Sequence, residues 1–279
     1  HWTVQKAEAA GVEVIGDIEL FCRERASLCP KAPFIAITGT NGKSTTTALI
    51  AHILRQAGYN VQLGGNIGRA VLTLDPLTLE RFYVVECSSF QIDLAPTIRP
   101  SVGVLLNVTP DHLDRHGTMT NYAGVKERLI AGADKATVVI DDDWTSAIAE
   151  KYRSAGKDIL TASTRDTADI VFSGSSVFFR KEPVADLAGV AALRGRHNGE
   201  NACAAYGALR LAGLRNDEIV PHMLTYPGLA HRLEQIGRLG STLFINDSKA
   251  TNAESAEKAL ATWPRGIHII LGGKAKEGG

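Results

Sequence analysis

The chain has 279 residues, and its 30 basic side chains balance its 30 acidic ones. This balance gives no electrostatic footprint for nucleic acid or for an anionic membrane surface. No apolar run approaches the ~18 residues of a membrane span and no basic-then-apolar leader is present, so we expect a cytoplasmic protein. The four cysteines have the spacing of neither a zinc site nor a disulfide framework: Cys22, Cys29, Cys87 and Cys203.

The first thirty residues predict two helices. One lies around Val4 to Ala10, and residues 12–26 carry a short apolar run that passes into a charged helix. The chain begins with His1 and ends in GGKAKEGG directly after an apolar segment. Because neither end is typical of a natural terminus, we expect part of a longer protein.

The stretch from Phe34 to Leu54 predicts a buried strand, a glycine-bearing turn and an amphipathic helix, in that order. The turn reads T-G-T-N-G-K-S-T over residues 38–45. It departs from the strict pattern G-x-x-x-x-G-K-[ST], because Ile37 stands where that pattern has its first glycine. What remains still predicts a phosphate-binding loop.

Each residue type in this turn has a chemical reason. Gly39 and Gly42 let backbone N–H groups turn toward phosphate oxygens, and the N-terminus of the following helix adds partial positive charge. Lys43 can reach the β and γ phosphates of a nucleotide, and the hydroxyl of Ser44 can bind Mg²⁺. The plainer interpretation is a glycine turn that only joins a strand to a helix.

Further strands alternate with helices along the chain, which indicates a mainly parallel sheet covered on both faces. Residues 58–68 give a short strand that ends in a glycine turn around Asn66, and 82–93, 101–117 and 136–143 each begin as apolar strands. Ligands bind at the carboxyl ends of such strands. Five polar residues follow strands directly: Glu86, Asn107, Asp111, His112 and Asp141.

Glu86 is a candidate ligand for nucleotide-bound Mg²⁺, because a carboxylate at a strand end beside a phosphate loop suits that ion. A helix cap or a surface acid is its alternative. We expect His112 to be structural unless it lies near Glu86 and Lys43. Residues 141–143 are expected to form only a solvated loop.

The second half of the chain predicts a small antiparallel excursion over 159–179, then a turn over 195–199 and a helix from Glu200. A Y-P-G-L turn at 226–229 marks a domain boundary. Beyond it we expect a strand over 241–247, a polar turn, a helix over 253–263 and a strand over 267–273, the opening of a second α/β domain.

Eight motifs, taken together and in order, resemble the Mur ligases of bacterial cell-wall synthesis. They are TGTNGKST, GGNIG, ECSSFQ, NVTPDHLDRH, YAGVKERL, GRHNGENACAA, GLAHRLE and NDSKATN. The resemblance implies an α/β fold with a P-loop central domain and the start of a second, Rossmann-like domain. It also implies the domain limits: 1–12 as the remnant of an N-terminal domain or linker, 13–226 as the ATP-binding domain and 227–279 as part of a C-terminal domain.

The reaction implied by the resemblance is ATP-dependent amide synthesis in peptidoglycan precursor formation, with Mg²⁺ as cofactor. A substrate carboxylate attacks the γ phosphate to give an acyl phosphate and ADP, and an incoming amine then displaces phosphate. NDSKATN after HRLE favours D-glutamate as the amine and UDP-N-acetylmuramoyl-L-alanine as the carboxylate. A monomer that binds neither nucleic acid nor membrane is also implied.

The resemblance assigns roles to individual residues. The nucleotide would be bound by Gly39, Thr40, Asn41, Gly42, Lys43, Ser44, Thr45, Asn198, Asn201, Arg232 and Asp247. The muramoyl substrate would be bound by Asn66, Ser88 and Gln91, and D-glutamate would lie near Lys249, Thr251 and Lys276. Metal ions would be bound by Ser44, Glu86, His112 and Lys126, and the catalytic residues would be Lys43, Lys126 and His112.

Lys126 is the least obvious of these residues. From its pattern alone it is a solvated helix lysine. In the family the matching lysine is carbamylated, which turns an amine into a carboxylate-like metal ligand. That chemistry needs a neutral amine, so the resemblance implies that burial lowers the pKa of Lys126.

Three other interpretations stay open from the sequence. A sibling amide ligase, including the folate polyglutamate ligases, would share the phosphate loop and the lysine chemistry. A nucleotide-binding module without ligase activity would act through a partner. An unspecified P-loop ATPase remains possible if Glu86, His112 and Lys126 have no role.

Overall fold

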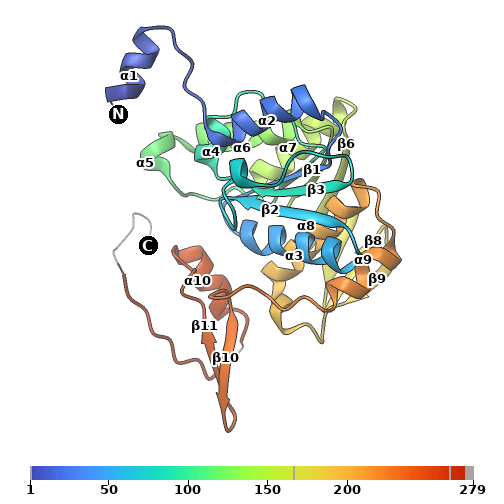
Figure 1. Ribbon diagram of the computed structural model, residues 1–279. Helices are drawn as coiled ribbons and strands as arrows, with labels where there is room; N and C mark the ends of the chain where they lie inside the picture. Colours follow the sequence, from blue (N-terminus) through green and yellow to red (C-terminus); the bar gives the residue numbers. More distant parts are fainter. Residues whose placement is uncertain (1, 166, 264, 274–279) are drawn as a thin grey trace.

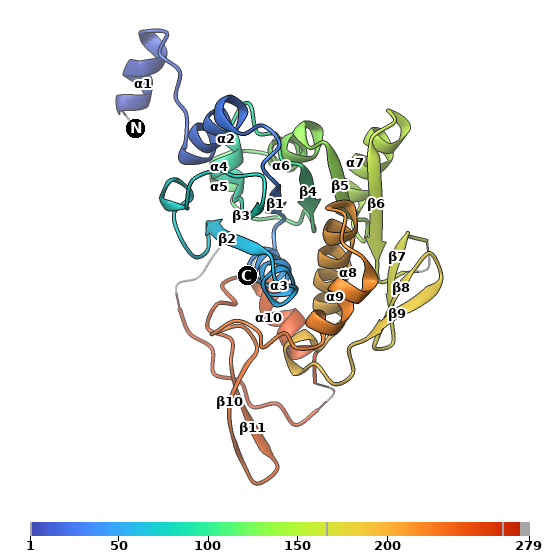
Figure 2. The ribbon, with the colours of Figure 1, turned by 45° about the vertical axis from the view of Figure 1, so that its right-hand side comes forward.

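The computed structural model of the protein describes residues 2–165, 167–263 and 265–273. One nine-stranded sheet with helices on both faces forms the main body, and a two-stranded sheet follows it (Figures 1 and 2). The strand order in the large sheet is β2-β3-β1-β4-β5-β6-β7-β8-β9. Within the described ranges, no helix is long and apolar enough to cross a membrane.

The strands of the large sheet are β1 Phe34–Thr38, β2 Asn60–Gly65, β3 Arg81–Glu86, β4 Val102–Leu105, β5 Lys135–Val139, β6 Asp158–Ser163, β7 Ile170–Ser173, β8 Ser176–Phe179 and β9 Glu182–Asp186. The small sheet pairs β10 Glu234–Leu239 with β11 Thr242–Asn246. The helices are α1 Trp2–Ala9, α2 Asp17–Leu28, α3 Lys43–Gln56, α4 Ser89–Asp93, α5 Leu113–His116, α6 Met119–Gly132, α7 Asp143–Ser154, α8 Arg196–Leu211, α9 Asn216–Met223 and α10 Ala253–Leu260.

The central strand β1 explains how the two layers of helices are held. All five of its residues are buried. Because side chains alternate across a strand, Ile35 and Ile37 pack with α3, α8 and α9, whereas Phe34 and Ala36 pack with α2, α4, α6 and α7. Strand β1 lies between β3 and β4 in parallel register, so the three strands end at one edge. The parallel sheet predicted from the sequence is confirmed.

The antiparallel part of the sheet differs from the expected excursion. Strand β6 pairs parallel with β5 and β7 pairs parallel with β6, so the main sheet continues to Ser173. Strand β8 pairs antiparallel with both β7 and β9, so only β8 runs against the direction of the other strands, and β9 was not predicted. Apolar and polar residues do not alternate along β9: Glu182, Pro183 and Asp186 are exposed, and only Ala185 is buried.

Helix α8 begins at Arg196, four residues before the expected start at Glu200. The glycines at 195 and 199 suggested a turn, but only Gly195 has a positive φ, of 90°. Gly199 lies inside the helix. A side chain is excluded there, because a Cβ would meet the ring of Phe172 on β7 at 2.1 Å. The second glycine therefore permits close packing of a helix on the sheet.

The segment after Tyr226 forms the β10–β11 hairpin and α10. The expected helix over 253–263 ends at Leu260. The expected strand over 267–273 does not form, because no described strand pairs with these residues and Ile270 is fully exposed. At the other end of the chain, α1 contributes no buried residue.

We predict that Gly199→Ala destabilises the protein by about 1–3 kcal/mol, because overpacking against Phe172 outweighs the better helix propensity of alanine. Gly124→Ala is the matched control, since a Cβ there meets nothing within 4 Å. It should stabilise α6 by about 0.5–1 kcal/mol. Urea unfolding of both variants measures the difference, and equal stabilisation by both would contradict the packing argument.

Candidate nucleotide-binding site

Asn107, which follows β4, holds the loop between β1 and α3. Its Oδ1 accepts hydrogen bonds from the backbone N–H groups of Thr40 and Asn41, at 3.1 and 2.8 Å. Its Nδ2 donates to the carbonyl oxygen of Asn41 at 3.1 Å. Because β4 is the neighbour of β1, Asn107 reaches the first half of the loop with its side chain and also with its backbone carbonyl oxygen, which accepts from the N–H of Thr40 at 2.9 Å.

The N-terminus of α3 provides donors for an anion. The first backbone hydrogen bond at this end runs from the N–H of Thr46 to the carbonyl oxygen of Gly42, at 3.0 Å. The N–H groups of residues 43–45 therefore have no acceptor inside the helix, and the helix dipole favours negative charge beside them. Gly42 has a φ of 88°, and a Cβ there would lie 2.2 Å from Oδ1 of Asn201. Both the turn and the close approach of α8 require glycine.

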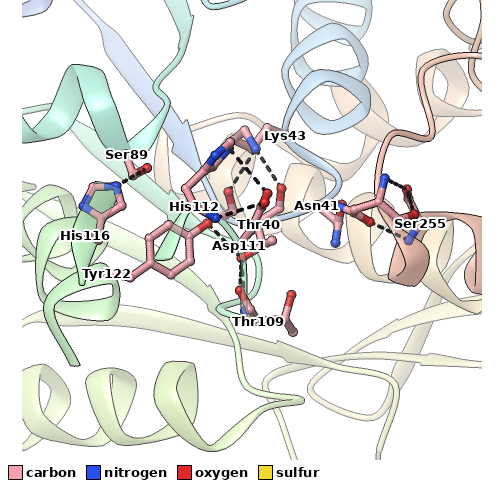
Figure 3. A network of polar contacts seen from close by, with 12 residues as sticks. Thr40, Asn41, Lys43, Ser89, Thr109, Asp111, His112, His116, Tyr122 and Ser255 are labelled. Atoms are coloured by element: carbon pink, nitrogen blue, oxygen red, sulfur yellow. Dashed lines mark hydrogen bonds and ion pairs between the residues drawn. The ribbon is translucent and has the colours of Figure 1, made fainter. Parts of the chain in front are cut away.

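Lys43 folds back on the loop. Its Nζ donates to the carbonyl oxygens of Gly39 and Thr40, at 3.0 and 2.8 Å (Figure 3). Burial lowers the pKa of Lys43, and the carboxylate of Glu86 offsets part of that effect. Phosphate oxygens would be stronger acceptors for this ammonium than two neutral carbonyls.

Glu86 ends β3 and is only 1% exposed. Its Oε1 accepts a hydrogen bond from Nδ2 of Asn66 at 2.9 Å, whereas its buried Oε2 has no partner among the described residues. A buried carboxylate oxygen without a partner is costly, so this atom suits a cation. Ser44, the second residue of α3, accepts a hydrogen bond from Nη2 of Arg232 at 3.1 Å.

Glu86 and Ser44 suit Mg²⁺ that is bound partly by a nucleotide, rather than a metal ion held by protein ligands alone. The described ranges contain no group of three or more His, Cys, Asp or Glu side chains that could hold a metal ion. Mg²⁺ usually takes one or two protein oxygens and completes its shell with phosphate and water. The donor set therefore suits a metal that arrives with a nucleotide.

Lys126, on α6, is 1% exposed, so the solvated helix lysine suggested by its pattern alone is wrong. Its Nζ donates to the carbonyl oxygen of Gly39 at 2.7 Å and lies 4.6 Å from the ring centroid of Tyr122. Burial lowers the pKa of Lys126 well below its usual value, and the charge of Lys43 lowers it further. An amine in this position loses its proton more easily than one in water.

Tyr122 links α6 to the loop. Its hydroxyl lies 3.2 Å from Oγ1 of Thr40, and the ring of His116 packs against it with centroids 5.3 Å apart. Nε2 of His116 lies 3.0 Å from Oγ of Ser89, so polar contacts continue to α4 (Figure 3). Thr40 was expected to bind nucleotide, but its hydroxyl makes hydrogen bonds to other residues of the protein.

His112 precedes α5 with a φ of 53°, a left-handed conformation that is strained for histidine. Its Nε2 lies 3.5 Å from Oδ2 of Asp111, and its ring packs edge-on against Phe90. Asp111 also acts electrostatically on both Lys43 and Lys126. The pair Asp111 and His112 therefore lies on the lysine side of the loop.

A cleft opens on the other side of the loop. Residues from α3, α8, α10 and the connection before β10 line it: Asn41, Gly42, Thr45, Asn107, Ala192, His197, Asn198, Glu200, Asn201, Tyr226, Gly228, Leu229, Arg232, Leu233, Asp247, Ala250, Ser255, Lys258 and Ala259. Burial, together with the charge of Lys258, lowers the pKa of His197 to about 4, so its ring is neutral at pH 7.

The cleft brings together seven of the residues expected to bind nucleotide: Asn41, Gly42, Thr45, Asn198, Asn201, Arg232 and Asp247. Asn198 and Asn201 are already engaged in part. Nδ2 of Asn201 donates to Oδ1 of Asn198 at 3.1 Å, and Oδ1 of Asn201 accepts from Oγ1 of Thr46 at 3.2 Å. Burial raises the pKa of Asp247, against the lowering effect of Arg232.

The residues expected to bind the substrates are more dispersed. Ser88 and Gln91 form a capping box at the start of α4, in which each side chain bonds to the backbone of the other. Asn66 touches the site through Glu86. Lys249 and Thr251 are exposed on the turn after β11, and Lys276 lies outside the described residues.

Sequence reasoning gave no role to several residues that shape the site. Asn252 caps α10 and donates from Nδ2 to Oδ1 of Asn41 at 3.3 Å, so the last residue of NDSKATN touches the loop. The expectation of a solvated loop over 141–143 is wrong. Asp141 is half-buried and accepts hydrogen bonds from Ser163 and Thr164, and Asp142 caps α7. A strand-end position was the available signal for Asp141.

The fold and the site define a P-loop nucleotide-binding protein of the parallel α/β type. Residues 37–209, more than half of the chain, match the family described as Mur ligase middle domain. The chain therefore belongs to the Mur ligase family.

The chain is 58% identical over its whole length to the UDP-N-acetylmuramoylalanine--D-glutamate ligase of Mesorhizobium japonicum and 54% identical to that of Brucella abortus. It spans 61% of the length of each of these relatives. The MurF structure from Acinetobacter baumannii superposes on 88% of the chain, and on 57% of its own, with a TM-score of 0.72 and 24% identity. MurF from Thermotoga maritima, solved with ADP, gives 0.67 with 18% identity over 88% of the chain and 60% of its own. These structural likenesses support the fold alone.

We predict that Asn107→Ala weakens ATP binding and lowers the free energy of unfolding by about 1–3 kcal/mol, because it removes the side-chain hydrogen bonds to the N–H and the carbonyl oxygen of Asn41. Calorimetric titration with ATP and urea unfolding measure the two effects. Asn60→Ala, at the exposed start of β2, is the control. A variant at position 107 with unchanged ATP affinity would show that the loop does not depend on this amide.

Proposed function

We propose that this chain supplies the nucleotide-binding centre of an ATP-dependent ligase that joins D-glutamate to UDP-N-acetylmuramoyl-L-alanine. The observation that carries the proposal is the meeting of Lys43, the free N–H groups of α3 and the partnerless Oε2 of Glu86 at one sheet edge. The printed name shared by the relatives at 54–58% identity supplies the two substrates. The activity belongs to a protein of the relatives' length, of which this chain spans three-fifths.

In the first step a carboxylate oxygen of the muramoyl substrate attacks the γ phosphorus, and the bond to the β–γ bridging oxygen breaks to release ADP. Lys43 leaves the carbonyls of Gly39 and Thr40 and donates to the β and γ phosphates. The N–H groups of residues 43–45 hold the phosphate oxygens in line. Mg²⁺, held by Ser44 and Glu86, would neutralise charge on the phosphates.

In the second step the amine of D-glutamate attacks the acyl phosphate carbon, and inorganic phosphate leaves through a tetrahedral intermediate. Arg232 already reaches the loop through Ser44, so its guanidinium is in place to balance charge on the leaving phosphate. Asn66, Ser88 and Gln91 would bind the muramoyl substrate, and Lys249, Thr251 and Lys276 would lie near D-glutamate.

The remaining roles belong to the same proposal. Asn198, Asn201 and Asp247 bind the nucleoside from the cleft side, and His112 serves a second metal ion and the reacting carboxylate. The domain limits at 12 and 226, the monomeric state and the cytoplasmic location, each expected from the sequence, are part of this proposal. The end of the large sheet before the β10–β11 hairpin supports the second limit.

Lys126 carries a carbamate in this proposal. Its amine is buried beside Lys43, and its lowered pKa favours the neutral form that attacks the carbon of CO₂, with loss of one proton, to give the carbamate. The anionic carbamate would then supply an oxygen ligand to the metal ions, alongside Glu86 and His112.

We predict that Lys126→Ala lowers ligase activity at least about 100-fold, as expected when a buried charged group beside the phosphates is lost. Added acetate should restore part of the activity, because it replaces the carbamate oxygens. Lys135→Ala, at the exposed start of β5, is the control. Full activity of Lys126→Ala without acetate would remove the carbamate from the mechanism.

The substrate assignment predicts phosphate release from ATP that requires both UDP-N-acetylmuramoyl-L-alanine and D-glutamate. The assay uses the protein at its full natural length and a panel of amino acids. Dependence on another amine would keep the mechanism but move the protein to a sibling ligase. No release with any amine would contradict the ligase assignment and leave a nucleotide-binding module.

A further inference from the structure

Tyr226, in the connection between α9 and β10, combines two properties that no proposed role explains. It lines the cleft beside the loop, and it is only 5% exposed. Its hydroxyl is buried and has no hydrogen-bond partner among the described residues. Among the residues that line the cleft and are described, no other side chain has a buried polar atom in this condition.

The surroundings of Tyr226 restrict where a partner can come from. The ring belongs to the core formed by α3, α8 and α9, and one edge contacts His52 with ring centroids 5.7 Å apart. These neighbours are packed protein, whereas the cleft is space that a ligand can enter. Burial raises the pKa of Tyr226, so the group remains a neutral hydroxyl that can both donate and accept.

The position of Tyr226 along α3 indicates which part of a nucleotide it meets. His52 is nine residues after Lys43, or about 13 Å along the helix axis at 1.5 Å per residue. In the proposed function the phosphates bind at the start of that helix, so a ring that contacts His52 lies away from them, on the side where the nucleoside would extend. The apolar residues Ala192, Leu229 and Ala259 line the same cleft and suit the faces of a purine.

We propose that the Tyr226 hydroxyl forms a hydrogen bond with the nucleoside part of ATP and contributes to the choice of nucleotide. The inference rests on the proposed function, because it assumes that the cleft binds ATP. The partner is a polar atom on the purine edge or a ribose hydroxyl, which offer the same hydrogen-bonding chemistry. In the free protein the hydroxyl is unsatisfied, and the nucleotide supplies the missing bond.

Two effects of opposite sign follow for Tyr226→Phe, which keeps the ring and removes the hydroxyl. The nucleotide-free protein should keep or gain thermal stability, because an unsatisfied buried group is removed. The Kd for ATP should rise by about 2- to 12-fold, the usual worth of one neutral hydrogen bond. Differential scanning calorimetry and isothermal titration of the full-length protein measure the two effects.

Tyr83→Phe is the matched control. Tyr83 is fully buried, and its hydroxyl donates to the carbonyl oxygens of Asp75 and Pro76, away from the cleft. Loss of a satisfied hydroxyl should lower the Tm and leave the Kd for ATP unchanged. The two tyrosine variants therefore have opposite expected patterns.

Tripolyphosphate and three ATP analogues locate the partner. Inorganic tripolyphosphate should bind the parent protein and Tyr226→Phe equally, since it lacks a nucleoside. If the loss seen with ATP disappears with 2′- or 3′-deoxy-ATP, the partner is the ribose; if it disappears with purine riboside triphosphate, it is the 6-amino group of the base. A loss that persists with all three analogues assigns the bond to a ring nitrogen of the purine.

Each other outcome overturns a defined statement. Equal ATP affinity of the parent protein and Tyr226→Phe overturns the inference alone. A lower Tm for Tyr226→Phe without nucleotide shows that the hydroxyl has a partner in the protein, and weaker tripolyphosphate binding makes the contact one to phosphate; both overturn it. A parent protein that binds no nucleotide overturns the proposed function as well.

Discussion

One carbonyl oxygen, that of Gly39, accepts hydrogen bonds from the half-buried Lys43 and the buried Lys126. Burial lowers the pKa of each lysine, and the charge of Lys43 lowers the pKa of Lys126 further. The arrangement is stabilised by anything that brings negative charge to the loop. A polyphosphate does so for Lys43, and carbamylation would do so for Lys126. The cost of burying these charges is thus linked to the chemistry of the site.

The sheet makes this concentration of charge possible. Strands β1, β3 and β4 end together, so Gly39, Glu86 and Asn107 reach one edge from three separate parts of the sequence. Glu86 supplies the negative charge that offsets Lys43, and Asn107 fixes the loop whose carbonyls receive both lysines. The two helix layers bury the side chains of β1 from both faces and keep that edge rigid. Loop geometry therefore depends on packing far from the ligand.

The sequence predicted the elements whose signal is local. The strand, loop and helix around Lys43 and the three apolar strands after it appear where their apolar periodicity placed them. Contacts between residues far apart in the chain could not be predicted from local sequence patterns. Gly199 was taken for part of a turn because its reason, the ring of Phe172, lies on a distant strand. Lys126 resembled a surface lysine because burial depends on how α6 packs, and the strand expected over 267–273 failed because apolar composition does not supply a pairing partner.

The polar contacts between the loop and the segment after Tyr226 have a kinetic meaning. Arg232 reaches Ser44, and Asn252 reaches Asn41, across separations of 188 and 211 residues. A hydrogen bond of this kind contributes only about 0.5–3 kcal/mol, and the loop itself is fixed from the other side by Asn107. The segment can therefore release the loop without disturbing the large sheet. If the cleft binds nucleotide as proposed, exchange of the bound nucleotide requires the breaking of these side-chain contacts, while the hydrogen bonds of the large sheet stay in place.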